Sequence, residues 1–269
     1  MTNSVIAEIL VLRKRASTWV LLSTWTALAL FFSYVLPYVE QRSMTELLPE
    51  GLAGTLVRGF PFFGGVFALM LGVLAVGSDY SWDTMKTLLT QRPSRLRMLA
   101  AKLMALGIVL VLFVASVAVT ATVASYVVAS VENAAVDWPS AWLLVRTFAA
   151  GWFVLVVWAA LGVMLAVLSR GTSLAIGIGI LYALVIEGLL SALVTQLEVL
   201  DGLSEFFLRT NSYSIASALG ASTETIADSG PGAFAGPYVS SGQAAAVLAA
   251  YAICFVVAAA VALRRRDVA

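Results

Sequence analysis

The chain has 269 residues, of which 61% are hydrophobic and 12% are charged, with a net charge of +1 and a mean hydropathy of +0.97. Soluble domains carry about twice that share of charged residues, so the composition excludes an ordinary soluble protein and indicates a multi-pass membrane protein. The absence of histidine and the single cysteine exclude histidine-dependent catalysis, histidine-ligated zinc and an intrachain disulfide.

The N-terminal residues 4–15 (SVIAEILVLRKR) are apolar with a basic end, and a longer apolar run begins near Trp19. This pattern indicates a helix lying at the membrane interface, although an early start of the first membrane span gives the same pattern. The basic residues resemble the start of a signal peptide. The apolar run is longer than that of a signal peptide and shows no convincing cleavage site, so we expect it to remain as an anchor.

Six apolar runs near or above the ~20 residues that cross a bilayer predict six membrane-spanning helices. The predicted spans are 19–39, 59–77, 99–131, 141–168, 172–197 and 242–263. The third and fourth runs exceed the required length, so we expect these helices to tilt or to project beyond the bilayer. The whole chain, residues 1–269, is thus predicted to be a single all-α membrane domain.

Twelve of the sixteen basic residues fall on one side of the membrane in this arrangement. Because basic residues favour the cytoplasmic side, both termini and the loop 78–98 are predicted to be cytoplasmic. The simplest location is the plasma membrane of a prokaryote. No basic segment indicates a nucleic-acid module, so we expect a lipid environment and no nucleic-acid partner.

The loop between the second and third spans contains the most informative segment, residues 77–102. Met85, Leu88 and Leu89 have i, i+3 and i+4 spacing, which predicts a short helix with one apolar edge that ends before Pro93. An exposed apolar edge fits a groove on a partner protein, but it also fits a helix that lies flat on lipid. Both interpretations stay open at this stage.

Some residues inside the predicted spans are candidates for a substrate or ion path. These are Glu187, Phe32, Phe63 and Phe67. A charge in the position of Glu187 costs about 2.5–3.5 kcal/mol on insertion scales. Glu187 is therefore either a carboxylate facing a cavity or a hydrogen-bonded structural acid, for which Arg146 and Arg58 are candidate partners. The phenylalanines are candidates to line a hydrophobic cleft, but aromatic residues are also common near membrane boundaries.

The stretch between the fifth and sixth spans, residues 198–241, has two halves of different amino-acid composition. Its first half is predicted to form two short helices that return into the outer leaflet, separated near residues 210–212. Its second half is rich in Gly, Pro and Ser and is predicted to be a loop. Small residues in the later spans, such as Gly177 and Gly179, indicate close helix packing.

These features resemble the permease subunit of ABC-2 type (type V fold) ABC transporters over nearly the whole chain. That family typically shows Gly, an acid, Gly-Thr-Leu/Met, paired leucines, Pro, Arg and a Leu before Lys. The matching residues are Gly77, Asp79, Thr84, Met85, Leu88, Leu89, Pro93, Arg95, Leu99 and Lys102. The N-terminal pattern of Glu8, Arg13, Arg15 and Trp19 also looks like the family. Asp79 stands where glutamate is more usual, and Asp83 replaces a common glycine.

The resemblance implies an amphipathic elbow helix at the N-terminus, a coupling helix between spans two and three, and two short re-entrant helices between spans five and six. It also implies that two permeases, identical or related, pair with two copies of a separate ATP-binding subunit that holds ATP and Mg. The docking residues would be Asp79, Asp83, Met85, Lys86, Leu88 and Leu89. The chain itself has no GxxxxGK[ST] phosphate loop, so we expect no enzyme activity, bound cofactor or metal site in it.

The leading functional prediction is therefore the permease subunit of an ATP-driven exporter that moves a hydrophobic or amphipathic compound, such as a drug, an antibiotic or a lipid-like molecule. The alternative is a cation channel or an ATP-independent membrane sensor, in which Glu187 would serve a cation path. An intramembrane protease is disfavoured, because the chain lacks histidine and clustered intramembrane acids.

Overall fold

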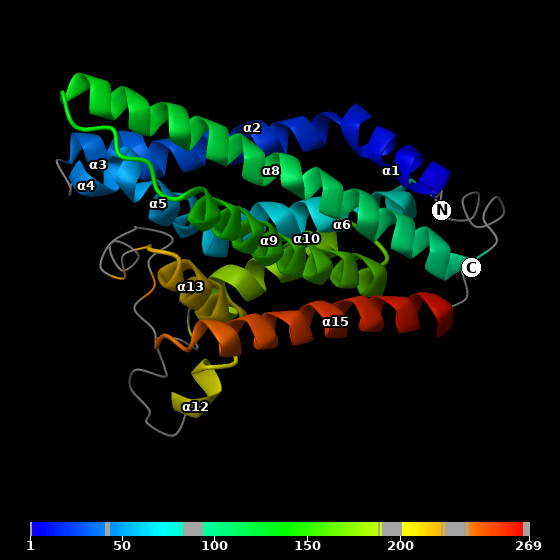
Figure 1. The fold of residues 1–269 in the computed structure, drawn as a ribbon. Coiled ribbons are helices and arrows are strands. Elements are labelled where there is room, and N and C mark those ends of the chain that lie inside the picture. Colours follow the sequence, from blue (N-terminus) through cyan, green and yellow to red (C-terminus); the bar gives the residue numbers. More distant parts are fainter. Residues whose placement is uncertain are drawn as a thin grey trace.

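The computed structural model is an elongated bundle of helices that run roughly side by side (Figure 1). It describes residues 2–40, 44–82, 94–187, 189, 201–221, 223, 234 and 237–265. Those residues form helices and connecting turns and contain no β-strand. The predicted all-helical class is therefore confirmed.

Four helices in the described part of the chain are long and apolar enough to cross a membrane. They are α2–η1–α3 (Ala16–Val39), α8 (Arg95–Val131), α9 (Ala141–Ser169) and α15 (Ser241–Arg265). These helices coincide with the predicted first, third, fourth and sixth spans and indicate a membrane protein. With 37 residues, α8 is about 55 Å long at ~1.5 Å per residue, so it extends beyond a hydrocarbon layer of about 30 Å.

The second and fifth predicted spans are shorter apolar helices in the structure. The second consists of a π-helical turn, η3 (Phe60–Gly64), followed by α6 (Gly65–Ser81). The fifth consists of α10 (Ser173–Ile180) followed by a π-helical segment, η4 (Leu181–Ile186). Most of the remainder of the predicted fifth span lies outside the described residues, so the count of six spans stays a prediction.

The π-helical turns of the first two spans each lie beside a proline. The turn η1 (Phe31–Val35) is followed by Pro37 in α3 (Leu36–Val39), and η3 contains Pro61. A proline inside a helix has no N–H to donate, and its ring clashes with the carbonyl four residues earlier, so the backbone is displaced there. Such π-helical turns are frequent at functional sites.

The central helix of the bundle is α9, since 67% of its most apolar stretch is buried. It packs against α6, α8, α10 and α15. Its contact with α6 is close enough that a Cβ atom at Gly72 would lie 2.2 Å from the carbonyl oxygen of Ala159, and one at Gly162 would lie 2.1 Å from that of Leu69. Glycine at these two positions allows the two backbones to touch.

The two chain ends lie at the same end of the bundle, which we call the terminal end (Figure 1). There α1 (Thr2–Lys14) packs against α8 and is separated from α2 by an extended residue, Arg15 (φ −78°, ψ 124°). The side chain of Arg95 donates to the carbonyl of Leu263 at 3.1 Å, so the start of α8 is joined to the last turns of α15. The opposite end, which we call the distal end, carries α3, α4 (Met44–Leu47) and α5 (Leu52–Arg58) (Figure 1).

In the described part of residues 198–241 there are two short helices, and the break between them lies earlier than predicted. They are α12 (Asp201–Ser204) and α13 (Leu208–Ala218). The predicted separation near residues 210–212 is wrong, because these residues lie within α13. The Asn211 amide donates to the carbonyls of Glu205 (2.8 Å) and Phe207 (2.7 Å). A polar side chain that bonds back to the preceding turn can remain inside a helix instead of ending it.

Candidate functional site

Charged side chains from distant parts of the chain meet inside the terminal end of the bundle. We call this group the inner ion cluster; it consists of Glu8, Arg15, Asp79 and Lys102. The four residues come from α1, from the break between α1 and α2, from the last turn of α6 and from the second turn of α8. Two carboxylates and two cations give the cluster no net charge.

Lys102 lies at the centre of the inner ion cluster. Its Nζ atom is 2.9 Å from Glu8 Oε2 and 2.7 Å from Asp79 Oδ2. It donates hydrogen bonds to Glu8 and, at 3.2 Å, to the carbonyl oxygen of Ala75, and it forms an ion pair with Asp79. The Lys102 side chain is 3% exposed, and a lysine is buried to this extent almost only when it is paired.

Arg15 joins the same carboxylate from the other side. Its Nη1 atom donates to the carbonyl oxygen of Leu74 at 2.6 Å, and its Nη2 atom lies 3.7 Å from Asp79 Oδ1. Its guanidinium also lies over the ring of Trp82, 5.0 Å from the centroid. Burial lowers the pKa of Arg15, while the carboxylates of Asp79 and Glu8 act in the opposite direction. Two cations near the C-terminal end of α6 also suit its helix dipole.

The inner ion cluster holds both flanks of residues 83–93. Asp79 belongs to the helix before this segment and Lys102 to the helix after it, and both are joined to α1 or its end through Glu8 and Arg15. Losing one partner of a buried ion pair costs about 3–5 kcal/mol. A displacement of either flank therefore either moves α1 with it or breaks buried ion pairs. The cluster thus couples the movement of the two flanking helices to that of α1.

Of the predicted docking residues, only Asp79 is among the described ones. It is 5% exposed and lies inside the inner ion cluster, at the base of the segment and not on its surface. The others, Asp83, Met85, Lys86, Leu88 and Leu89, lie outside the described residues, and their docking role stays a prediction. The sequence indicated Glu8, Arg15 and Lys102 only as separate family-like positions. The sequence feature that could have singled them out is a charged residue placed beside an apolar run.

Glu187 is 1% exposed, and one of its oxygens accepts three hydrogen bonds. Oε1 accepts from the Tyr182 hydroxyl at 2.7 Å, from the Leu208 amide at 2.9 Å and from the Arg209 amide at 3.4 Å. The two amides begin α13, whose N-cap residue Phe207 provides no side-chain cap. Glu187 therefore caps α13 from the end of η4, which favours the structural interpretation of this acid.

The partners of Glu187 differ from the two arginines considered from the sequence. Arg58 instead lies 3.0 Å from Glu46. Tyr182 was not anticipated, because it lies five residues before Glu187 and an α-helical spacing would not place the two together. In the π-helical segment η4 the repeat is wider, and residues five apart come onto one face.

The aromatic candidates lie on the first two spans, at or beside their π-helical turns. The rings of Phe32 and Phe63 stack with their centroids 5.1 Å apart and an interplanar angle of 18°. Phe67 lies 6.1 Å from Trp25. The structure thus brings Phe32 and Phe63 together, whereas Glu187 contacts η4 and α13. A path lined by these residues stays a prediction.

Comparison with known proteins finds a matching family, but it does not indicate an activity. The family described as "Protein of unknown function (DUF2705)" matches residues 9–269. A search among curated proteins finds no match to the chain. The family match contains Arg15, Asp79 and Lys102, together with every helix from α2 onward. The function must therefore be inferred from the residues and geometry of the chain itself.

Proposed function

We propose that this chain, which belongs to the DUF2705 family of proteins of unknown function, is the permease subunit of an ATP-driven exporter of the ABC-2 type. The observation that carries the proposal is the inner ion cluster, which joins both flanks of residues 83–93 to α1. A segment that receives force from a partner needs such a rigid attachment, and a surface loop with no mechanical role does not.

In the proposed mechanism, energy enters the chain by contact with a separate ATP-binding subunit. Residues 83–93 dock in a groove of that subunit, with Met85, Leu88 and Leu89 as the apolar anchor. Asp79 and Lys102 then pass the movement into α6 and α8. Because α6 packs closely along α9, a shift of α6 reshapes the bundle. Two permeases, identical or related, with two ATP-binding subunits complete the transporter.

The proposed orientation places the terminal end of the bundle in the cytoplasm of a prokaryotic cell. Basic residues gather at that end: Arg13, Lys14, Arg95, Arg97, Arg264 and Arg265. Positive residues near the ends of membrane spans favour the cytoplasmic side. The same side would hold the ATP-binding subunits, which need cytoplasmic ATP.

The proposed cargo is a hydrophobic or amphipathic compound, such as a drug, an antibiotic or a lipid-like molecule. The stacked, half-buried rings of Phe32 and Phe63 beside π-helical turns support this choice, because they offer apolar surface at deformable points of two adjacent spans.

The test is purification of the tagged chain from its native membrane, followed by identification of co-purifying proteins and an ATPase assay. We expect a stoichiometric soluble ATP-binding subunit that is lost in Leu88→Asp. Thr87→Asp is the matched control, since it places the same charge in the same segment but away from the predicted apolar edge. Equal membrane insertion of both variants would separate docking from folding.

Two outcomes would contradict the proposal. Retention of the partner and of ATPase activity by Leu88→Asp would remove the docking role of the segment. Purification of a lone oligomer with no ATPase activity would favour the alternative, a cation channel or an ATP-independent sensor, and conductance of that oligomer in planar bilayers would distinguish these two.

A further inference from the structure

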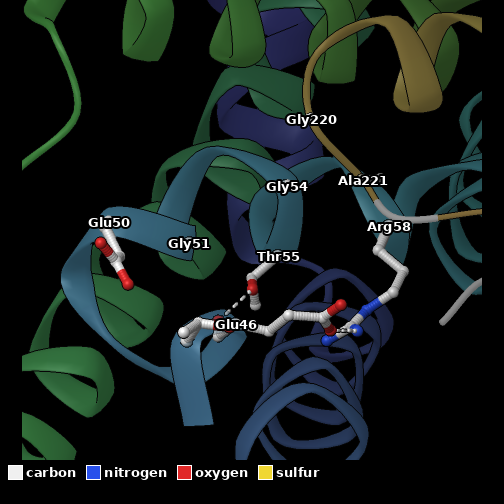
Figure 2. Close-up of a pocket in the computed structure, with 9 residues that line it drawn as sticks. Glu46, Glu50, Gly51, Gly54, Thr55, Arg58, Gly220 and Ala221 are labelled. Carbon is white, nitrogen blue, oxygen red and sulfur yellow. Dashed lines mark hydrogen bonds and ion pairs between the residues drawn. The ribbon is translucent and has the colours of Figure 1, made fainter. Parts of the chain in front are cut away.

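A pocket of about 300 Å³ lies at the distal end of the bundle, away from the inner ion cluster (Figure 2). Its walls come from α4, the short 3₁₀ turn η2 (Pro49–Gly51), α5 and the turn that follows α13. Its volume is at the lower end of the range for small-molecule sites, about 300–1,000 Å³. The pocket is therefore large enough for a small organic molecule.

The pocket is held open by contacts within its walls. Glu46 Oε2 lies 3.0 Å from Arg58 Nη1, and the Thr55 hydroxyl donates to the carbonyl of Glu46 at 3.0 Å. On the far wall, a Cβ atom at Gly54 would lie 2.3 Å from the carbonyl oxygen of Gly220, whose φ is +101°. Because Gly220 has this backbone conformation and Gly54 has no side chain, α5 and the turn meet directly. The site is thus preformed.

Among the described residues that line the pocket, the charged side chains are Glu46, Glu50 and Arg58, which together have a net charge of −1. Figure 2 shows the paired side chains of Glu46 and Arg58 on one side and Glu50 on the other. Arg58 is 9% exposed and neutralises Glu46, whereas Glu50 is exposed and adds the second carboxylate. The electrostatic preference is therefore for a cation. A bare metal ion, with ligands at about 2.0–2.6 Å, is far smaller than this space.

We propose that the distal pocket binds a small organic cation through a primary ammonium group. Such a group has three protons to donate, and the exposed carboxylate of Glu50, which is not paired with Arg58, is its acceptor. The alkyl part of the ligand would lie over the glycine-lined wall at Gly51 and Gly54. This site is separate from the proposed docking of an ATP-binding subunit, so either proposal can fail without the other.

The test uses the full chain purified in detergent and isothermal titration with 1,4-diaminobutane. Its neutral analogue, 1,4-butanediol, has the same length. We expect saturable binding of the diamine, no binding of the diol, and a loss of affinity of about tenfold or more in Glu50→Gln. Glu50→Lys, which supplies its own ammonium group, should abolish binding. Asp137→Asn is the matched control, because Asp137 is an exposed acid between α8 and α9, outside the pocket.

Several results would overturn the proposal. These are absence of diamine binding, equal binding of the diol, or equal weakening in Asp137→Asn and Glu50→Gln. Displacement of the diamine by equimolar Ca²⁺ would also contradict it, since it would indicate a metal site. An unchanged thermal unfolding midpoint of Glu50→Gln shows that any loss of affinity is local.

Discussion

Lys102 and Asp79 lie 2.7 Å apart, and through this contact the helices before and after residues 83–93 are joined at their bases. Lys102 also binds Glu8 of α1 at 2.9 Å, so one ammonium group holds three helices together. The charged side chains of the inner ion cluster are almost fully buried. Loss of one of these charges should therefore lower the free energy of unfolding more than loss of a surface charge.

Substitution of Lys102 should strongly destabilise the protein. In Lys102→Met, Glu8 and Asp79 both lose the buried ammonium group that lies 2.9 Å and 2.7 Å from their carboxylates. We expect a loss of about 3–5 kcal/mol in the free energy of unfolding, measured by titration with sodium dodecyl sulfate in mixed micelles. Lys14→Met removes an exposed charge from the same end and should change the free energy by at most about 0.5 kcal/mol.

A double-mutant cycle distinguishes the ion pair from other effects of Lys102. If Glu8 and Lys102 interact directly, the combined variant Glu8→Gln/Lys102→Met should be less unstable than the sum of the single variants, by about 0.5–3 kcal/mol. Strict additivity would show that the two side chains do not stabilise each other.

The sequence predicted elements better than it predicted contacts. The limits of α8, α9 and α15 agree with the predicted spans within a few residues, because long apolar runs leave few alternatives. The pair Glu8 and Lys102 is separated by 94 residues, and no periodicity within one helix relates such distant positions. Composition also could not show that Glu187 accepts hydrogen bonds from the start of α13, since this depends on how the chain returns to the bundle.

Loss of the Glu187 carboxylate should loosen the start of α13. In Glu187→Leu the Leu208 and Arg209 amides lose their acceptor, and removal of a helix cap costs about 0.5–2 kcal/mol. Hydrogen exchange of these amides should accelerate by about tenfold for each ~1.4 kcal/mol lost. Glu187→Gln retains an acceptor oxygen and should show a smaller effect.

Glu205→Gln is the control for the Glu187 variants, because Glu205 precedes α13 and its carboxylate accepts from Gln243 instead of from the α13 amides. We expect little change in exchange at Leu208. Unchanged exchange in Glu187→Leu, combined with an altered cation conductance, would support the ion-path interpretation of Glu187 over the cap.

The stacked pair Phe32 and Phe63 should contribute a measurable coupling energy. Aromatic pairs of this kind contribute about 0.5–1.5 kcal/mol beyond the area that they bury. A double-mutant cycle with Phe32→Leu and Phe63→Leu, measured by the same unfolding titration, should give a coupling in that range. A coupling near zero would show that the two rings do not stabilise the spans, and would leave cargo contact as their remaining predicted role.

The contact between α6 and α9 should tolerate no side chain at Gly72 or Gly162, where the two backbones touch. In Gly72→Ala or Gly162→Ala the new methyl group meets a carbonyl oxygen at about 2 Å, so the helices must separate, at a cost of about 1–3 kcal/mol or more. Gly177→Ala is the matched control, because nothing lies within 4 Å of a Cβ atom there. Alanine is favoured over glycine in a helix by about 1 kcal/mol, so this variant should be neutral or more stable. Similar unfolding free energies for all three variants would contradict the close packing of α6 on α9.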